Sequence, residues 1–207
     1  SIAIGSQDDK YGNTVANVTG TIAIGYGVNS LWGSIAIGNP VTSKSYDPYI
    51  DTEASFNSVA IGQGVKASGD MSRAIGYLTS ATGDYSTAIG NYANATGENS
   101  ISIGNSSNAY GEASIALQGT TSNLGYGSVA IMGGTVNSYA TAIGAGAYAY
   151  GENSTAIGGG ATDGKKSVAI GYESYAAAEN SMALGPNSYA GEENTISVGN
   201  DGSYQYM

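Results

Sequence analysis

The chain has 207 residues and contains no histidine and no cysteine, and only three prolines. It therefore lacks the commonest general base, the commonest metal ligand, any thiol nucleophile and any disulfide. No constellation of paired carboxylates stands out to replace them. We expect a non-enzymatic protein with no catalytic residue, no cofactor and no metal site.

Basic residues are also scarce, with 6 Lys and Arg against 16 Asp and Glu and a net charge of −10. This charge repels phosphate backbones, so nucleic acid is not an expected partner. No segment reaches the roughly 18 apolar residues of a membrane span, so the region is not expected to be embedded in a membrane. Phe and Trp occur once each, against 17 Tyr. Such a bias places aromatic rings where a hydroxyl group can meet water or a partner.

What the chain has instead is a short repeat built around Ser-x-Ala-Ile-Gly, with most copies 14 residues apart. We number the positions of one copy from Ser86 (position 1) to Asn99 (position 14). A fixed short period indicates a repeat architecture, and this one runs along the whole chain as a single domain. Position 4 is aliphatic in every copy, at Ile4, Ile24, Ile37, Ile61, Ile75, Ile89, Ile103, Leu117, Ile131, Ile143, Ile157, Ile170, Leu184 and Val198.

Alternation within the repeat predicts two short strands per copy, at positions 1–4 and 7–11, each followed by a turn. Glycine at positions 5 and 12 is expected to supply the positive φ of a tight corner. Copies in register predict an all-β parallel β-solenoid of about fourteen 14-residue coils. In such a fold each coil hydrogen-bonds to the next, and stability comes from neighbouring coils.

Positions 2 and 4 share one face of the first strand and are mostly Ile, Leu or Val, whereas positions 3, 8 and 10 are small. A thin coil has little room for both large rows, so we expect an apolar stripe on the surface. Identical chains around a shared axis match such a stripe coil for coil, which predicts a homo-oligomer, most simply a homotrimer. The alternative is a monomer whose interior holds both rows. The predicted trimer interface contains Ile4, Ile24, Ile37, Ile61, Ile75, Ile89 and Ile103.

The repeated S-x-A-I-G and A-x-G-E-N-S motifs resemble the head domain of trimeric autotransporter adhesins, the YadA-like head. The clearest copies are Ser58–Gly62, Ser86–Gly104 and Ser154–Gly158. The resemblance implies a left-handed parallel β-roll over residues 1–199, with three chains to a head. It also implies a stalk anchored in a Gram-negative outer membrane. The head is then extracellular, at the surface of the bacterial cell. Residues 200–207 are predicted to start a head-to-neck connector, although they depart from the basic and aliphatic pattern usual in that neck.

Two insertions interrupt the repeat, at residues 6–20 and 39–57. Loops inserted into solenoids protrude and often carry binding. The alternative is that the lone Trp and the lone Phe cap the solenoid and pack the second loop down. The first predicted binding patch consists of Trp32, Tyr46, Asp47, Tyr49 and Phe56.

A second candidate binding surface is a row of tyrosines at positions 9 and 11, which should point away from the small positions 8 and 10. Rigid rings among Ser, Gly and Asn resemble the composition of antibody paratopes. The alternative is the β-propensity of tyrosine at exposed strand sites. The row consists of Tyr110, Tyr148, Tyr150, Tyr175 and Tyr189.

The function predicted from these features is that of an adhesin head. Such a head binds host cell-surface glycoproteins or extracellular-matrix proteins and promotes attachment and virulence. One alternative is a passive spacer that projects another binding head. Another is an ice-binding solenoid, because regular Ser and Thr rows on flat sheets can order water.

Overall fold

The computed structural model of the chain describes residues 1–5, 7–8, 12–16, 19–39, 51–121, 126–135 and 137–199. Within these ranges the chain forms strands and turns and no helix, and hence no helix able to span a membrane. The chain divides into two units, Ser1–Ser107 and Asn108–Met207. We call them unit 1 and unit 2.

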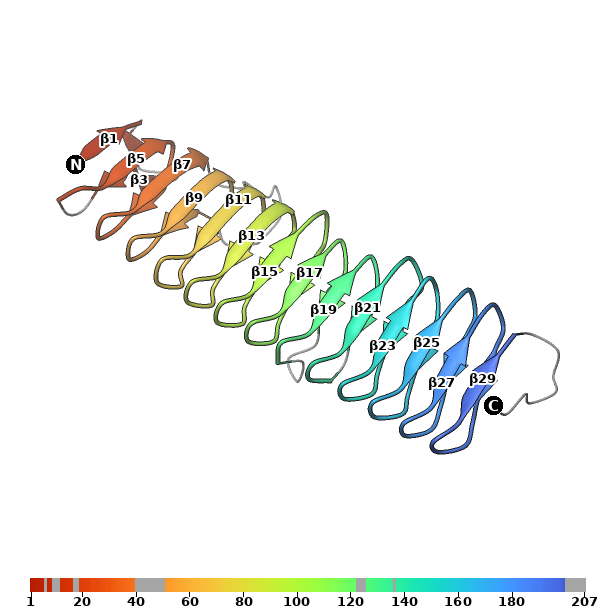
Figure 1. The fold of residues 1–207 in the computed structure, drawn as a ribbon. Helices are drawn as coiled ribbons and strands as arrows, with labels where there is room; N and C mark the ends of the chain where they lie inside the picture. Colours follow the sequence, from red (N-terminus) through yellow and green to blue (C-terminus); the bar gives the residue numbers. More distant parts are fainter. Residues whose placement is uncertain are drawn as a thin grey trace. The chain divides into compact units, whose positions relative to one another are not determined.

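Unit 1 contains two parallel sheets, and each coil contributes one strand to each sheet (Figure 1). The first sheet contains, in order, β1 (Ile2–Ile4), β5 (Ile22–Gly25), β7 (Ile35–Asn39), β9 (Val59–Gln63), β11 (Arg73–Tyr77), β13 (Thr87–Asn91) and β15 (Ile101–Ile103). The second sheet contains β4 (Val15–Ala16), β6 (Val28–Ser30), β8 (Thr52–Ala54), β10 (Lys66–Ala67), β12 (Ser80–Ala81) and β14 (Asn94–Ala95).

Unit 2 has the same construction. Its first sheet contains β17 (Ile115–Leu117), β19 (Val129–Ile131), β21 (Thr141–Ile143), β23 (Thr155–Ile157), β25 (Val168–Ile170), β27 (Met182–Leu184) and β29 (Ile196–Val198). Its second sheet contains β16 (Asn108–Ala109), β18 (Thr120–Thr121), β20 (Gly134–Thr135), β22 (Tyr148–Ala149), β24 (Ala161–Thr162), β26 (Tyr175–Ala176) and β28 (Tyr189–Ala190).

The register between coils follows the repeat, so equivalent positions face one another. In unit 1, Ile75 of β11 pairs with Ile61 of β9 and with Ile89 of β13. In unit 2, Ile157 of β23 pairs with Ile143 and Ile170. Every position-4 residue lies in a first-sheet strand. The predicted parallel β-solenoid is therefore confirmed.

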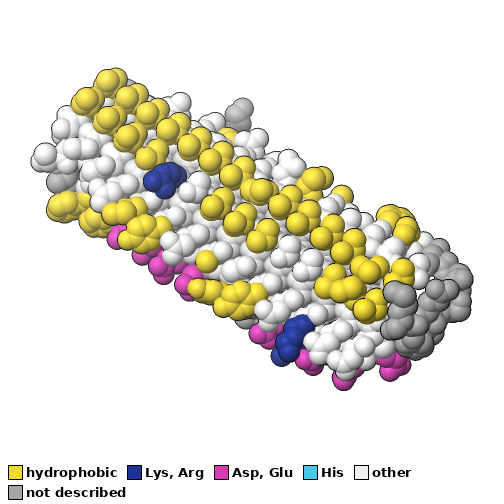
Figure 2. Space-filling view, in the orientation of Figure 1, with side chains coloured by type: hydrophobic (Ala, Val, Ile, Leu, Met, Phe, Trp, Pro, Cys, Tyr) yellow, Lys and Arg dark blue, Asp and Glu magenta, His cyan; other side chains and the backbone are white. Residues whose placement is uncertain are grey.

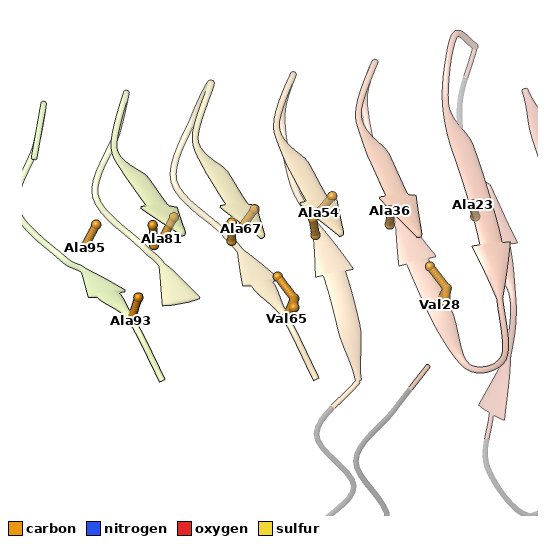
Figure 3. Packing of buried hydrophobic residues seen from close by; sticks show 12 residues of the cluster. Ala23, Val28, Ala36, Ala54, Val65, Ala67, Ala81, Ala93 and Ala95 are labelled. Atoms are coloured by element: carbon orange, nitrogen blue, oxygen red, sulfur yellow. The ribbon is translucent and has the colours of Figure 1, made fainter. Parts of the chain in front are cut away.

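The interior of each coil is narrow and is filled by small side chains from positions 1, 3, 8 and 10. Figure 3 shows alanines from both sheets of unit 1 pointing into the space between them, with Val28 and Val65 among them. The seryl hydroxyls of position 1 are buried as well, and Ser154 Oγ donates to the carbonyl oxygen of Gly151 at 2.6 Å. Close-packed interiors are sensitive to single methyl groups, so such a core specifies residue size tightly.

The residue sizes at positions 8 and 10 of one coil are related. In unit 1 the larger residue stands at position 8, as in Val65 with Ala67. In unit 2 the larger residue stands at position 10 in three coils, where position 8 is glycine. Those three pairs are Gly119 with Thr121, Gly133 with Thr135, and Gly160 with Thr162.

The turns correct one prediction. Glycine at position 5 does have positive φ, as at Gly90 with 138°. Position 12 does not, and the positive φ falls instead on position 14, as at Asn99 with 57° and Asn153 with 57°. Asparagine tolerates this left-handed conformation better than most residues.

Position 12 is glycine for a different reason, which is the close approach of the next coil. A Cβ added at Gly83 would lie 2.2 Å from the carbonyl oxygen of Gly97, and one at Gly164 would lie 1.9 Å from that of Ala178. The residue is therefore small because there is no room for a side chain.

The first insertion is partly built into the solenoid. Strands β2 (Gln7–Asp8) and β3 (Gly12–Asn13) form an antiparallel pair. Strand β4 then joins the second sheet, where Val15 pairs with Asn29. Of the second insertion, residues 40–50 lie outside the described residues.

Candidate functional site

The outward side of the first sheet carries an apolar stripe along each unit. Because side chains alternate along a strand, positions 1 and 3 enter the core and positions 2 and 4 point outward. Ile4 is 58% exposed, Ile75 36% and Ile103 39%, whereas Ala74 beside Ile75 is fully buried. Figure 2 shows the hydrophobic side chains as a band over the first-sheet strands of each unit. The alternative in which both rows fill the interior is wrong, because the interior holds alanine and serine.

The stripe has few polar interruptions at position 2. Arg73 is the one charged residue there, and threonine stands at three other coils, Thr87, Thr141 and Thr155. All four lie in first-sheet strands, in register with Ile or Val of a neighbouring coil. The aliphatic row at position 4 has no interruption at all.

Trp32 and Phe56 of the first predicted patch form a pair on the surface. They lie in turns that lead from the second sheet back to the first, with ring centroids 5.8 Å apart and an interplanar angle of 13°. Their exposed fractions are 54% and 48%. The second insertion leaves the solenoid at a different corner, since it follows β7 of the first sheet and precedes β8 of the second. Its three predicted contact residues, Tyr46, Asp47 and Tyr49, lie outside the described residues.

Sequence reasoning missed two apolar neighbours of this pair. Met71 and Tyr85 occupy position 14 of the next two coils, with φ of 55° and 59° and exposed fractions of 46% and 52%. The Met71 amide donates to the carbonyl oxygen of Phe56 at 2.9 Å, which fixes their adjacency. A large residue at a left-handed turn position, where asparagine is usual, is the signal that points to them.

The predicted tyrosine row lies in unit 2, on the outward side of the second sheet. Tyr148, Tyr175 and Tyr189 stand at position 9, and the register places Ala161 between the first two. Tyr150, at position 11 of the same coil as Tyr148, has its ring centroid 5.8 Å from that of Tyr148 and nearly parallel to it, at 8°. We call the group of Tyr148, Tyr150, Tyr175 and Tyr189 the tyrosine face. Tyr110 is also exposed, but the coils of β18 and β20 separate it from this group.

One tyrosine of this face is held by a carboxylate. The Tyr175 hydroxyl donates a hydrogen bond to Asp163 Oδ2, on the preceding coil. This hydrogen bond, with lesser contributions from desolvation and from the charge of Asp163, raises the pKa of Tyr175 to about 12. The ring of Tyr189 lies 5.8 Å from that of Tyr175, tilted by 41°. Tyr175 therefore stays protonated throughout the physiological range.

Acidic residues line the turns at position 13. Asp70 and Asp84 lie in adjacent coils of unit 1, and the Asp70 amide donates to Asp84 Oδ1 at 2.9 Å. In unit 2 the row also contains Lys165, whose Nζ lies 3.3 Å from Glu152 Oε2, while Lys166 Nζ lies 3.8 Å from Glu179 Oε1. These pairs are solvent-exposed and contribute little to stability. Because acidic residues outnumber the lysines in these turns, the row forms a predominantly negative edge beside both sheets.

Across the described residues, no group of three or more Asp or Glu side chains is gathered as metal ligands would be. The surfaces that the structure does build are extended and flat, and they repeat from coil to coil. Such surfaces suit contact with another extended molecule.

The chain was compared with known protein families. The family model described as the YadA head domain repeat, two copies long, matches residues 67–93, 95–117, 137–161, 163–188 and 176–201. Together these ranges cover more than half of the chain. No curated protein matches it significantly.

Proposed function

This chain belongs to the YadA head family, the heads of trimeric autotransporter adhesins, and from that premise we propose that three copies assemble through the apolar stripe into one adhesive head. The head stands at the bacterial surface on an outer-membrane anchor and attaches the cell to host receptors or matrix proteins, which promotes virulence. The assembly comes first, because it decides which surfaces remain available for binding.

The observation that carries the proposal is the exposure of position 4 in an otherwise well-packed chain. A solenoid that buries alanine and serine yet leaves Ile75, Ile89 and Ile103 more than a third exposed presents its largest apolar side chains to water. Monomeric soluble proteins rarely expose a contiguous apolar patch of this kind. Burying an isoleucine side chain contributes roughly 1.5–3 kcal/mol. An interface between chains along the apolar stripe, which we call the seam, therefore removes a large apolar area from contact with water.

The regular register supports identical copies as the partners. Ile61, Ile75 and Ile89 follow one another at the spacing of adjacent strands, about 4.8 Å. Another copy of the chain offers the same row at the same spacing, so one chain can match another over many coils. A closed ring of such contacts is a cyclic homo-oligomer, and the family implies three members.

Binding then falls on the surfaces that the seam leaves free. These are the turns with Trp32 and Phe56 and the outward side of the second sheet. The predicted contacts Tyr46, Asp47 and Tyr49 of the second insertion lie outside the described residues. Three copies present each surface three times, so weak single sites add up through avidity.

The test of the assembly is the solution mass of the protein, measured by light scattering on a sizing column. We expect about three times the chain mass of 20.7 kDa. A stable monomer at micromolar concentration would overturn the proposed seam.

The test of adhesion uses beads coated with the trimeric protein and presented to cultured epithelial cells and to immobilised matrix proteins. We expect attachment above that of beads coated with an unrelated trimer of equal charge. Equal attachment by both beads would overturn the adhesive role and favour a passive spacer.

A further inference from the structure

The tyrosine face lies on the outward side of the second sheet, whereas the Trp32 and Phe56 pair lies in turns. Tyr148 and Tyr189 are each nearly half exposed, at 46% and 45%. Each ring also rests beside a glycine. A Cβ at Gly134 would lie 3.1 Å from Tyr148 Cδ1, and one at Gly191 would lie 2.6 Å from Tyr189 Cε1. The rings thus pack on the backbone and keep a large part of their surface open to a ligand.

The spacing of the rings is set by the coils. Tyr148, Ala161, Tyr175 and Tyr189 lie in register on successive strands, and neighbouring strands are about 4.8 Å apart. This spacing between neighbouring coils is close to the length of one pyranose unit in an extended β-linked glycan. A glycan that crosses the strands therefore meets a tyrosine at nearly every sugar, with a gap at Ala161.

The chemistry of a pyranose suits these groups. Its axial C–H faces pack against aromatic rings, and its hydroxyl groups need both donors and acceptors. Tyrosine supplies an apolar ring and a polar tip in one rigid side chain. The carboxylate of Asp163, already fixed by Tyr175, retains lone pairs that can accept hydrogen bonds from sugar hydroxyls.

The charges around the tyrosine face select among glycans. Asp163 lies within it, and Glu152 and Glu179 lie on the turns of the same coils. The two nearby lysines are each paired with a glutamate. Like charges disfavour sialylated or sulfated chains, and a neutral glycan carries no such penalty.

From this placement we infer that the tyrosine face binds a neutral, extended β-linked glycan lying across the strands of the second sheet. The inference rests on the proposed adhesive function and names the class of ligand. The second sheet lies opposite the apolar stripe, so the tyrosine face stays open in the trimer, and three copies supply three sites.

The experiment measures binding of cellohexaose and of the N-acetylglucosamine hexamer (β-1,4-linked) to the trimeric protein by calorimetry, with a heparin hexamer as the anionic probe. The test variant combines Tyr148→Ser, Tyr175→Ser and Tyr189→Ser. The matched control combines Tyr92→Ser, Tyr139→Ser and Tyr172→Ser, three exposed tyrosines in turns or bends outside the tyrosine face. Solution mass and far-UV circular dichroism confirm that both variants fold and assemble.

We expect at least one neutral hexamer to bind and heparin not to bind. The test variant should lose about tenfold or more in affinity, which corresponds to about 1.4 kcal/mol, while the control stays within about twofold. The inference is overturned if neither neutral hexamer binds at millimolar concentration. It is also overturned if heparin binds better than both, or if the test variant binds as the parent does.

The outcomes separate this inference from the proposed function. A trimer that attaches to cells or matrix proteins but binds no neutral glycan keeps the adhesive role, removes the glycan site and indicates a protein receptor. A protein that binds the neutral hexamer through the tyrosine face, yet is monomeric or attaches to nothing, keeps the glycan site and removes the proposed assembly or role.

Discussion

Unit 1 and unit 2 each have a small-residue interior and an apolar stripe, but they differ on the outward side of the second sheet. In unit 1, position 9 is valine in the first coil, at Val15, and polar or charged in the others, at Asn29, Glu53, Lys66, Ser80 and Asn94. In unit 2 the same position becomes aromatic in its later coils, at Tyr148, Tyr175 and Tyr189. The backbone pairing is the same in both. Position 9 is therefore free of the constraints that fix the core.

The turns that lead from the second sheet back to the first differ less between the units. Trp32, Phe56 and Met71 are exposed in these turns of unit 1, and Tyr126 and Tyr139 are exposed in those of unit 2, with ring centroids 5.5 Å apart. The outward side of the second sheet is therefore the surface on which the two units differ most.

The largest effect is expected from breaking what the units share. Ile75→Asp together with Ile89→Asp places two carboxylates in the proposed seam, where burial without a partner is costly. We expect the solution mass to fall from that of three chains to that of one.

The matched control is Ser80→Asp together with Asn94→Asp, which adds the same charge to the outward side of the second sheet in the same unit. It should leave the mass unchanged. If both variants remain trimeric, the apolar stripe is not the seam.

The next effect tests whether the two units depend equally on the close approach of coils. Gly83→Ala in unit 1 and Gly164→Ala in unit 2 each place a methyl group against the next coil's carbonyl oxygen. We expect each to lower the free energy of unfolding by about 3 kcal/mol, measured by urea denaturation. Thr82→Ala, at an exposed neighbour, should change it by less than about 0.5 kcal/mol. A large loss in one unit alone would show that the coils are not equivalent.

A smaller effect tests whether the residues at positions 8 and 10 of one coil are coupled in the core. Thr162→Ala removes a methyl group and the hydrogen bond from Thr162 Oγ1 to Ser154 Oγ, 2.8 Å long, while Gly160→Ala adds a methyl group in the same coil. We expect each to destabilise by about 1–2 kcal/mol. The double variant recreates the alanine pair of Ala147 and Ala149 and should cost at least about 0.5 kcal/mol less than the sum. Strict additivity would mean that the two positions do not share space.

The smallest effect is a shift in one titration. Tyr175 has a pKa of about 12 against an ordinary 10.0, because it donates to Asp163. The folded state therefore holds this proton more tightly, so the stabilisation is complete below pH 10 and is lost as the pH rises through 12. Phenolate absorbance should show that the tyrosine that ionises near pH 12 in the parent ionises at lower pH in Asp163→Asn. An unchanged titration in that variant would remove the proposed hydrogen bond.

Much of this structure follows from the repeat, because strand alternation depends only on local sequence. The buried serine and alanine of positions 1 and 3, the outward aliphatic row and the parallel register were all predictable in this way. The tyrosine row was predictable for the same reason, since position 9 alternates with buried positions 8 and 10.

The turns were not predictable at this level. Glycine marks both a positive φ and a lack of space, and only the distance to the next coil shows that Gly83 is an example of the second. The stacking of Trp32 on Phe56 depends on an alignment of two turns across an insertion of irregular length. The repeat carries no information about that alignment.

The most direct test of the account uses the absence of cysteine, which lets a single introduced thiol report on one position. Ile75→Cys and Ile143→Cys place a thiol in the apolar stripe, and Ser80→Cys and Tyr148→Cys place one on the outward side of the second sheet, one pair in each unit. The measurement is the rate of maleimide labelling of the native assembly, relative to the same protein in urea. We predict strong protection at both stripe positions and rapid labelling at both second-sheet positions. Equal, rapid labelling at all four positions would contradict the account, because the stripe would then face water.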